Sequence, residues 1–160
     1  MVYSEDRETY GKDNTLTVER TIKSPGEPPS RVSYRGERRE RDGYVELTYI
    51  DTHQNKVLSM RVKVGANPGD EWPDARGEGK YRLVRFDKAE ASGPKGPIEL
   101  AQAVIEHRWE AVDGRGERTV TLTEIVLERE GGIQKEKSYL LLAGQKKLTR
   151  QRRLISSTCP

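Results

Sequence analysis

Apolar residues alternate with polar ones in short runs along most of this chain, and that period of two is the strongest constraint on its fold. The clearest run spans residues 58–64, where Leu58, Met60, Val62 and Val64 are separated by polar side chains. Successive side chains of a β-strand point to opposite faces, so this run predicts a strand with one buried and one wet face. We expect the four apolar residues to face inward.

Turn sequences separate the other alternating runs. Asp42-Gly43 and Asp113-Gly114 are typical of tight hairpins, and Gly131-Gly132 and Gly144-Gln145 are further turn signals. Each turn joins two β-rich runs, which predicts that the runs are antiparallel neighbours. In total, the chain predicts eight or nine strands joined mainly by short turns.

Two segments contain Gly, Pro or helix-forming residues that interrupt the alternation. Residues 65–79 are rich in Gly and Pro, which predicts a long irregular connection that Trp72 pins to the core. Residues 98–112 follow Pro97 and begin with good helix formers, but apolar side chains then alternate through Ile105 and beyond. Because a hairpin turn and another β-rich run come next, we predict a strand here, with a helix as the alternative.

The predicted fold is mainly β: an antiparallel meander that forms a strongly curved sheet, a partly open barrel or a two-layer sandwich. Only 32% of the residues are hydrophobic and 34% are charged, with a net charge of +3. A lean sheet with one solvated face fits this composition. We predict a flexible N-terminal segment over residues 1–14, a single β domain over residues 15–155, and a flexible C-terminal tail over residues 156–160.

No catalytic or metal-binding set is recognisable. The chain has two histidines, and in a strand the carboxylates of Glu106 and Glu110 would lie on the face opposite His107. Cys159 is the single cysteine, which excludes an internal disulfide and a cysteine-based metal site. The acidic residues around Trp72 match no known calcium loop and predict a solvated acidic loop. We therefore expect no enzymatic activity, no metal and no cofactor.

The C-terminal segment is the basic part of the chain. Residues 135–160 hold seven Lys or Arg against one Glu. Five of these form a candidate anion-binding set: Lys146, Lys147, Arg150, Arg152 and Arg153. Regular alternation would divide them between the two faces of a strand, and few aromatic residues accompany them for base stacking. A solvated sheet edge that resists aggregation is the alternative interpretation.

The sequence has no apolar stretch near 18 residues long and no charged, then apolar, region at its start. It therefore predicts neither a transmembrane segment nor a secretion signal in the chain as given.

Several short motifs occur in a recognisable order. They are Val62-Lys63-Val64-Gly65, Gly69-Asp70-Glu71-Trp72, Gly79-x-Tyr81, Pro94-x-Gly96 and Gly131-Gly132-Ile133-x-Lys135. Together they resemble bacterial envelope β-domain proteins with a lipoprotein-carrier-like architecture. The resemblance implies a periplasmic or envelope-associated location and a lipid-like ligand or an envelope protein as partner. The chain departs from that pattern in lacking an N-terminal signal or anchor segment and in having Gln134 and Lys135 after the glycine turn.

The sequence as a whole favours a non-enzymatic envelope or secreted β domain that binds a lipid-like ligand or a protein partner. In that case Leu58, Met60, Val62 and Val64 would line the ligand site, although the same residues serve equally well as plain core. The alternative is a cytoplasmic module that binds nucleic acid through the basic C-terminal strands.

Overall fold

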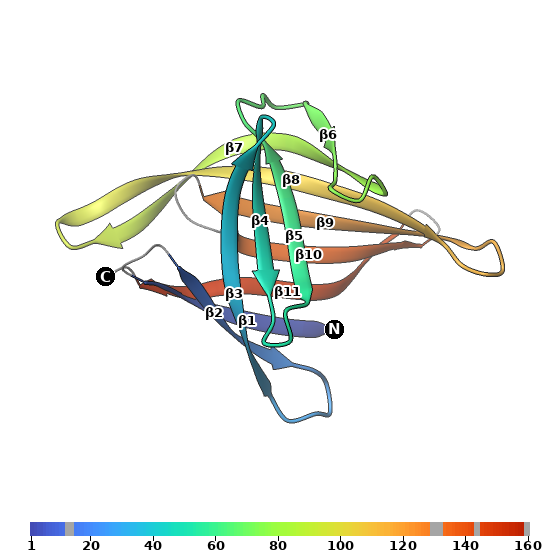
Figure 1. Cartoon of the computed structure of the whole chain (residues 1–160), viewed down its shortest axis with the longest axis horizontal. Coiled ribbons are helices and arrows are strands. Elements are labelled where there is room, and N and C mark those ends of the chain that lie inside the picture. Colours follow the sequence, from blue (N-terminus) through green and yellow to red (C-terminus); the bar gives the residue numbers. More distant parts are fainter. Residues whose placement is uncertain (12–14, 129–132, 143–144, 159–160) are drawn as a thin grey trace.

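A computed structural model describes residues 1–11, 15–128, 133–142 and 145–158, and in this part of the chain eleven strands form one sheet (Figure 1). The strands are β1 (Val2–Tyr10), β2 (Leu16–Lys23), β3 (Ser30–Arg41), β4 (Tyr44–Ile50), β5 (Lys56–Lys63), β6 (Glu71–Pro73), β7 (Gly79–Gly93), β8 (Gly96–Val112), β9 (Arg118–Glu128), β10 (Ile133–Leu142) and β11 (Gln145–Thr158). The described residues include no helix.

The strand order is β5-β4-β3-β2-β1-β11-β10-β9-β8-β7-β6. Every neighbouring pair is antiparallel except β1 and β11, which run parallel with Tyr3 opposite Gln151. Two meanders, β1 to β5 and β6 to β11, therefore share a central pair formed by the two ends of the chain. The prediction of a mainly antiparallel, strongly curved sheet is confirmed.

The predicted bounds of the β domain, residues 15–155, are too narrow, because described residues at both ends of the chain form strands. Val2–Tyr10 forms β1, which lies between β2 and β11 near the middle of the sheet. Its inward side chains are Ser4, Asp6 and Glu8, so this strand lacks the apolar alternation that marks the others. At the other end, the ladder between β1 and β11 continues to Thr158. Cys159 lies outside the described residues.

Two predictions about single segments hold. Residues 98–112 belong to strand β8, not to a helix. Trp72 is buried, with 3% of its surface exposed, so it pins the connection between β5 and β7 to the core. That connection is not wholly irregular, because Trp72 lies in the three-residue strand β6, which pairs with β7.

The structure confirms two of the predicted turns. Asp42 and Gly43 both have positive φ angles, 54° and 79°, as a tight hairpin between β3 and β4 requires. Asp113 and Gly114 lie in the turn between β8 and β9. Gly131, Gly132 and Gly144 lie outside the described residues.

The sheet bends so strongly that β3, β4 and β5 cross over the strands β7 to β11 (Figure 1). Its two edges, β5 and β6, come together without a hydrogen-bonded ladder between them, so the sheet stays open and does not close into a barrel. The main apolar cluster fills the interior near these edges: Leu47, Met60, Trp72, Tyr81, Leu83, Ile105, Ile125 and Ile133.

Buried charges occupy the central strands of the same interior. Asp6 of β1 accepts hydrogen bonds from Arg20 Nε and Nη2 at 2.7 and 2.8 Å. Arg152 of β11 is 2% exposed and lies 2.9 Å from Glu136 and 3.7 Å from Asp6. Buried charges are stable only when paired in this way. The interior therefore has an apolar part near the sheet edges and an ion-paired part at the centre.

Glu8 lies in this ion-paired part but has no ion pair of its own among the described residues. It is 2% exposed and accepts a 3.3 Å hydrogen bond from the Tyr49 hydroxyl, which reaches it across the bend of the sheet. Burial raises the pKa of Glu8, and the negative charge of Asp6 raises it further. Burial also raises the pKa of Tyr49, so its hydroxyl stays protonated and able to donate.

The pKa of Glu8 predicts a pH dependence of stability. Because the folded-state value lies above the ordinary value of 4.5, the folded chain holds this proton more tightly than the unfolded chain. Stability should then fall as the pH rises from 4.5 through the raised pKa. Glu8→Gln cannot ionise, so we expect it to remove this fall and to be at least as stable as the wild type near neutral pH, measured by urea unfolding across that range.

Glu5→Gln, on the outer face of β1, is the control. A hydrogen bond from Arg153 lowers the pKa of Glu5 despite some burial, so its contribution to stability should disappear as the pH falls. An unchanged pH profile for Glu8→Gln would contradict the prediction.

Candidate ligand-binding groove

An open groove of about 840 Å³ lies on the concave side of the sheet, between β3 to β5 on one side and β7 to β9 on the other. Twelve apolar side chains line it: Val45, Leu47, Val62, Val64, Ala66, Trp72, Leu83, Phe86, Ala101, Ala103, Ile105 and Leu127. This volume lies within the range of about 300–1,000 Å³ that is typical of small-molecule sites. The groove is thus large enough, and apolar enough, to hold a ligand.

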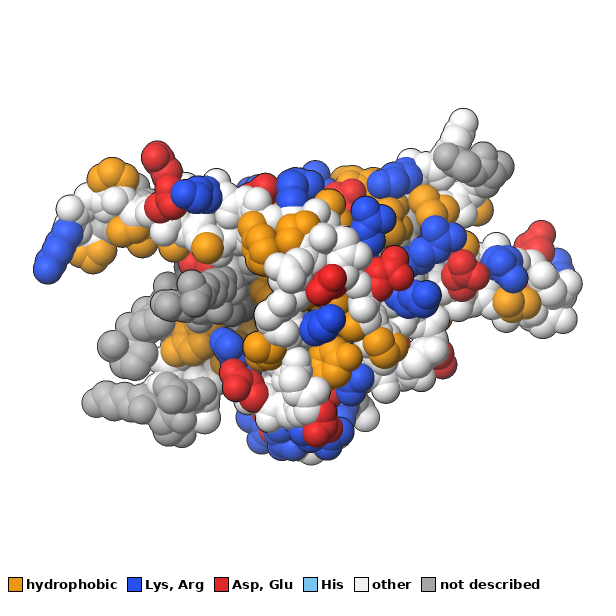
Figure 2. Space-filling view, turned by 90° about the horizontal axis from the view of Figure 1, so that it is seen from above, with side chains coloured by type: hydrophobic (Ala, Val, Ile, Leu, Met, Phe, Trp, Pro, Cys, Tyr) orange, Lys and Arg blue, Asp and Glu red, His pale blue; other side chains and the backbone are white. Residues whose placement is uncertain are grey.

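Some of these apolar side chains are open to water. Phe86 is 60% exposed and Val64 is 59% exposed, although both line the groove. In the space-filling view, hydrophobic side chains lie exposed along the projecting β7–β8 hairpin and in the hollow beneath it (Figure 2). A contiguous apolar surface left in solvent is typical of a binding site.

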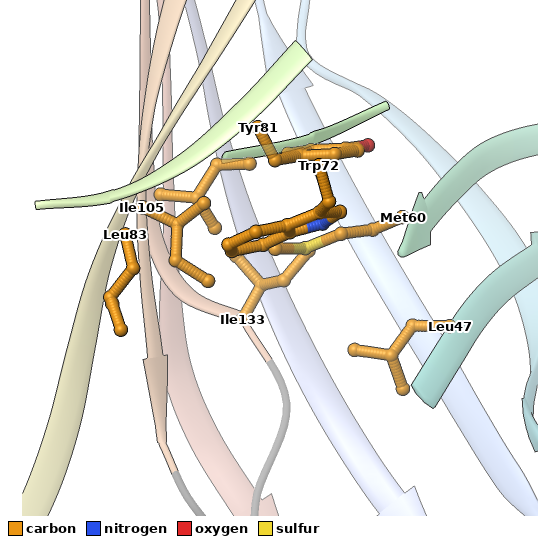
Figure 3. Close-up of a cluster of buried hydrophobic side chains, with 8 residues drawn as sticks. Leu47, Met60, Trp72, Tyr81, Leu83, Ile105 and Ile133 are labelled. Carbon is orange, nitrogen blue, oxygen red and sulfur yellow. The ribbon is translucent and has the colours of Figure 1, made fainter. Parts of the chain in front are cut away.

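The floor of the groove is the apolar cluster around Trp72. Figure 3 shows the Trp72 indole flanked by Tyr81 and Met60, with Leu83 and Ile105 nearby. The rings of Trp72 and Tyr81 are stacked, with centroids 5.9 Å apart, and Tyr81 stacks in turn on His107 at 4.3 Å. The floor is therefore densely packed, whereas the walls above it are not covered.

Side chains, not a backbone ladder, hold the two edges of the sheet together at this floor. Trp72 Nε1 donates a 2.7 Å hydrogen bond to the carbonyl of Arg61 on β5. The Tyr81 hydroxyl donates a 3.5 Å bond to the carbonyl of Ser59. Burial raises the pKa of Tyr81 to about 12, so this hydroxyl keeps its proton at neutral pH. These contacts fix the width of the groove at one end.

The four predicted ligand-binding residues do not all line the groove. Val62 and Val64 line the groove, with Val64 one residue beyond the end of β5. Met60 is 2% exposed and belongs to the floor. Leu58 is opposite Tyr49 in the β4–β5 ladder, and its side chain lies outside the described part of the structure.

Charged residues surround the apolar lining: Arg38, Glu40, Lys63, Asp87, Lys88 and Glu128. A second cleft, of about 720 Å³, adjoins the groove and shares Arg38, Glu40 and Leu47 with it. Arg38 and Glu40 therefore lie where the two hollows meet.

The predicted anion-binding residues do not form one surface. A bulge in β11 shifts the ladder with β10 between the pairs Tyr139–Leu148 and Ser138–Arg150, which changes the faces that regular alternation would assign. Arg152 is buried among carboxylates. Arg153 pairs with Glu5 at 2.6 Å, and Lys146 lies 3.7 Å from Glu124. Lys147 and Arg150 remain exposed on β11.

His107 has a partner that sequence proximity does not suggest. Its Nε2 lies 3.1 Å from Asp74 Oδ2, whereas Glu106 and Glu110 make no such contact with it. Burial alone would raise the pKa of Asp74, but hydrogen bonds with His107 and with backbone N–H groups outweigh it and lower the pKa. Asp74 also accepts bonds from the backbone of Arg76 and Glu78, so its role here is to shape the loop before β7.

Among the described residues, no group of three His, Cys, Asp or Glu side chains is placed to hold a metal ion. The described part of the chain also has no helix long and apolar enough to cross a membrane.

Comparisons with protein-family models, with curated proteins and with solved structures found no match to this chain. The resemblance to envelope β-domain proteins therefore stays a prediction.

Sequence reasoning found two groove residues and missed the rest. Phe86, Ala101 and Ala103 come from the long β7–β8 hairpin, which faces β5 across the groove only in the tertiary structure. The one available signal was the alternation of Ala103, Ile105, His107, Trp109 and Ala111, which marks a strand but not the groove that the start of this strand lines.

Proposed function

We propose that this chain binds an elongated lipid-like ligand, such as an acyl chain, in the concave groove and catalyses no reaction on it. The observation that carries the proposal is the uncovered apolar groove of about 840 Å³. An envelope or secreted location, where such a ligand would be met, is part of the same proposal. A protein partner with an apolar segment is the alternative occupant.

The shape and lining of the groove support an extended chain. The apolar residues come from six strands, β4 to β9, on two sides of the interior, so a ligand between them would lose water from both of its faces. Burying one methylene group gains about 0.8 kcal/mol, so the part of an acyl chain that enters the groove would supply most of the affinity. Exposed Phe86 and Val64 would be covered at the same time.

Filling the groove tests the proposal. Ala103 lies on β8 between Phe86 of β7 and Leu127 of β9, all three on the groove wall. Ala103→Trp places an indole in the space that the ligand would occupy. We expect it to weaken the binding of a fluorescent polyene fatty acid by about tenfold or more, measured by titration, where tenfold corresponds to about 1.4 kcal/mol.

Val112→Trp is the matched control, because Val112 ends the same strand, is 64% exposed and does not line the groove. It should bind the fatty acid like the wild type. Thermal unfolding of both variants checks that the sheet is intact. Equal affinity of Ala103→Trp and Val112→Trp, or no binding by the wild type, would contradict the proposal.

A further inference from the structure

Two charged side chains of β3 lie at the lip of the groove. In the β3–β4 ladder Arg38 is opposite Leu47 and Glu40 is opposite Val45, and both of these apolar residues line the groove. Because side chains alternate along a strand, Arg38 and Glu40 point to the same face. Both are exposed. The chain thus places one cation and one anion next to an apolar wall.

The other charged groups around the groove have partners. Lys63 lies 3.4 Å from Asp70, Lys88 lies 3.0 Å from Glu99, and Asp87 lies 3.0 Å from Arg85. Glu128 accepts a 2.8 Å hydrogen bond from Gln134. Within the described residues, Arg38 and Glu40 have no ion pair or hydrogen bond of this kind. They are therefore the charges left for a ligand.

The spacing of Arg38 and Glu40 indicates which kind of head group they could bind. Residues two apart on a strand are separated by about 6.5–7 Å, and here the two side chains also line both hollows at their junction. A ligand whose chain lies in the groove would have its head group at this junction. A carboxylate head would be attracted by Arg38 but repelled by Glu40, and an ammonium head would meet the opposite situation. A head group that carries both charges would satisfy both residues.

We infer that the groove takes a single-chain zwitterionic phospholipid, with the acyl chain on the apolar walls, the phosphate at Arg38 and the amine at Glu40. This inference rests on the proposed function. Guanidinium groups bind phosphate through paired N–H donors, which suits Arg38 to this role. A volume of about 840 Å³ matches one small ligand, which favours one chain over two.

Displacement of the bound fluorescent fatty acid measures the head-group preference. The competitors are lysophosphatidylethanolamine, which is zwitterionic, and lysophosphatidic acid of the same chain length, which lacks the amine. Both are used below the concentrations at which they form micelles. We expect the wild type to bind the zwitterion about tenfold more tightly than the anion.

The variants separate the two charges. Glu40→Gln should weaken the zwitterion and strengthen the anion, because it removes both an attraction and a repulsion. Arg38→Gln should weaken both. Glu19→Gln and Arg31→Gln remove the same charges from exposed positions on β2 and β3 away from the groove, and should leave both affinities unchanged.

The outcomes distinguish this inference from the proposed function. If the fatty acid does not bind the wild type, both are wrong. If the fatty acid and both competitors bind with similar affinity, and Arg38→Gln and Glu40→Gln change nothing, the apolar groove stands and the head-group assignment is wrong.

Discussion

Trp72→Ala is expected to lower the free energy of unfolding by about 3–5 kcal/mol, the usual cost of removing a buried aromatic side chain. Trp72 is 3% exposed, stacks on Tyr81 and donates to the carbonyl of Arg61. It therefore contributes to the core and also joins the two edges of the open sheet. Since small domains are stable by about 5–15 kcal/mol, a loss of this size approaches global unfolding.

Urea unfolding checks this prediction, with Trp109→Ala as the control. Trp109 is 36% exposed and donates a 3.3 Å bond to Glu78 at the surface, so its removal should cost far less. Trp72→Phe keeps an aromatic ring but removes the indole donor, and should give an intermediate loss of about 1–3 kcal/mol. If Trp72→Ala does not fold, the order of Trp72→Phe and Trp109→Ala still tests the idea. Equal stability of Trp72→Ala and Trp109→Ala would overturn it.

Asp6→Ala is expected to have an effect of similar size, about 3–5 kcal/mol, because breaking a buried ion pair leaves an uncompensated charge. Asp6 is 4% exposed and is the carboxylate that both Nε and Nη2 of Arg20 contact. Arg152 lies 3.7 Å away on the opposite neighbouring strand. Without Asp6, Arg20 would have no ion-pair partner among the described residues, and Arg152 would keep only Glu136.

A double-mutant cycle with Arg20→Leu isolates this interaction. Removing Asp6 and Arg20 together should recover much of the loss, since replacing a buried pair by apolar groups is often close to neutral. Glu5→Ala, which removes the partner of the half-exposed Arg153, should have a much smaller effect. Purely additive losses from the two buried positions in urea unfolding would contradict the prediction.

The buried charges also explain why the N-terminal strand was not predictable. A strand is recognised in a sequence by apolar alternation, but the inward positions of β1 are Ser4, Asp6 and Glu8. The burial of Asp6 and Glu8 is favourable only because Arg20, Arg152 and Tyr49 arrive from three other strands. No local pattern contains that information. The bulge in β11 lies between Lys146 and Arg152 and changes the faces that regular alternation would assign to them. It is likewise a property of the ladder with β10.

The candidate site was predictable only in part for a related reason. Residues 58–64 identified one wall, because their alternation is local. Whether an inward side chain belongs to closed core or to an open groove depends on what lies opposite. Met60 meets Trp72 and is covered, whereas Val62 and Val64 face the base of the β7–β8 hairpin and remain accessible.

The sequence by itself determined the fold class, the strand at residues 98–112, the hairpin turn at Asp42-Gly43 and the burial of Trp72, because period-two patterns and turn residues act over a few positions. Only the tertiary structure decided that the two chain ends pair in parallel, that charges fill the centre of the interior, and that the bend leaves an apolar groove. Those features depend on contacts between strands far apart in the chain, which local patterns do not encode.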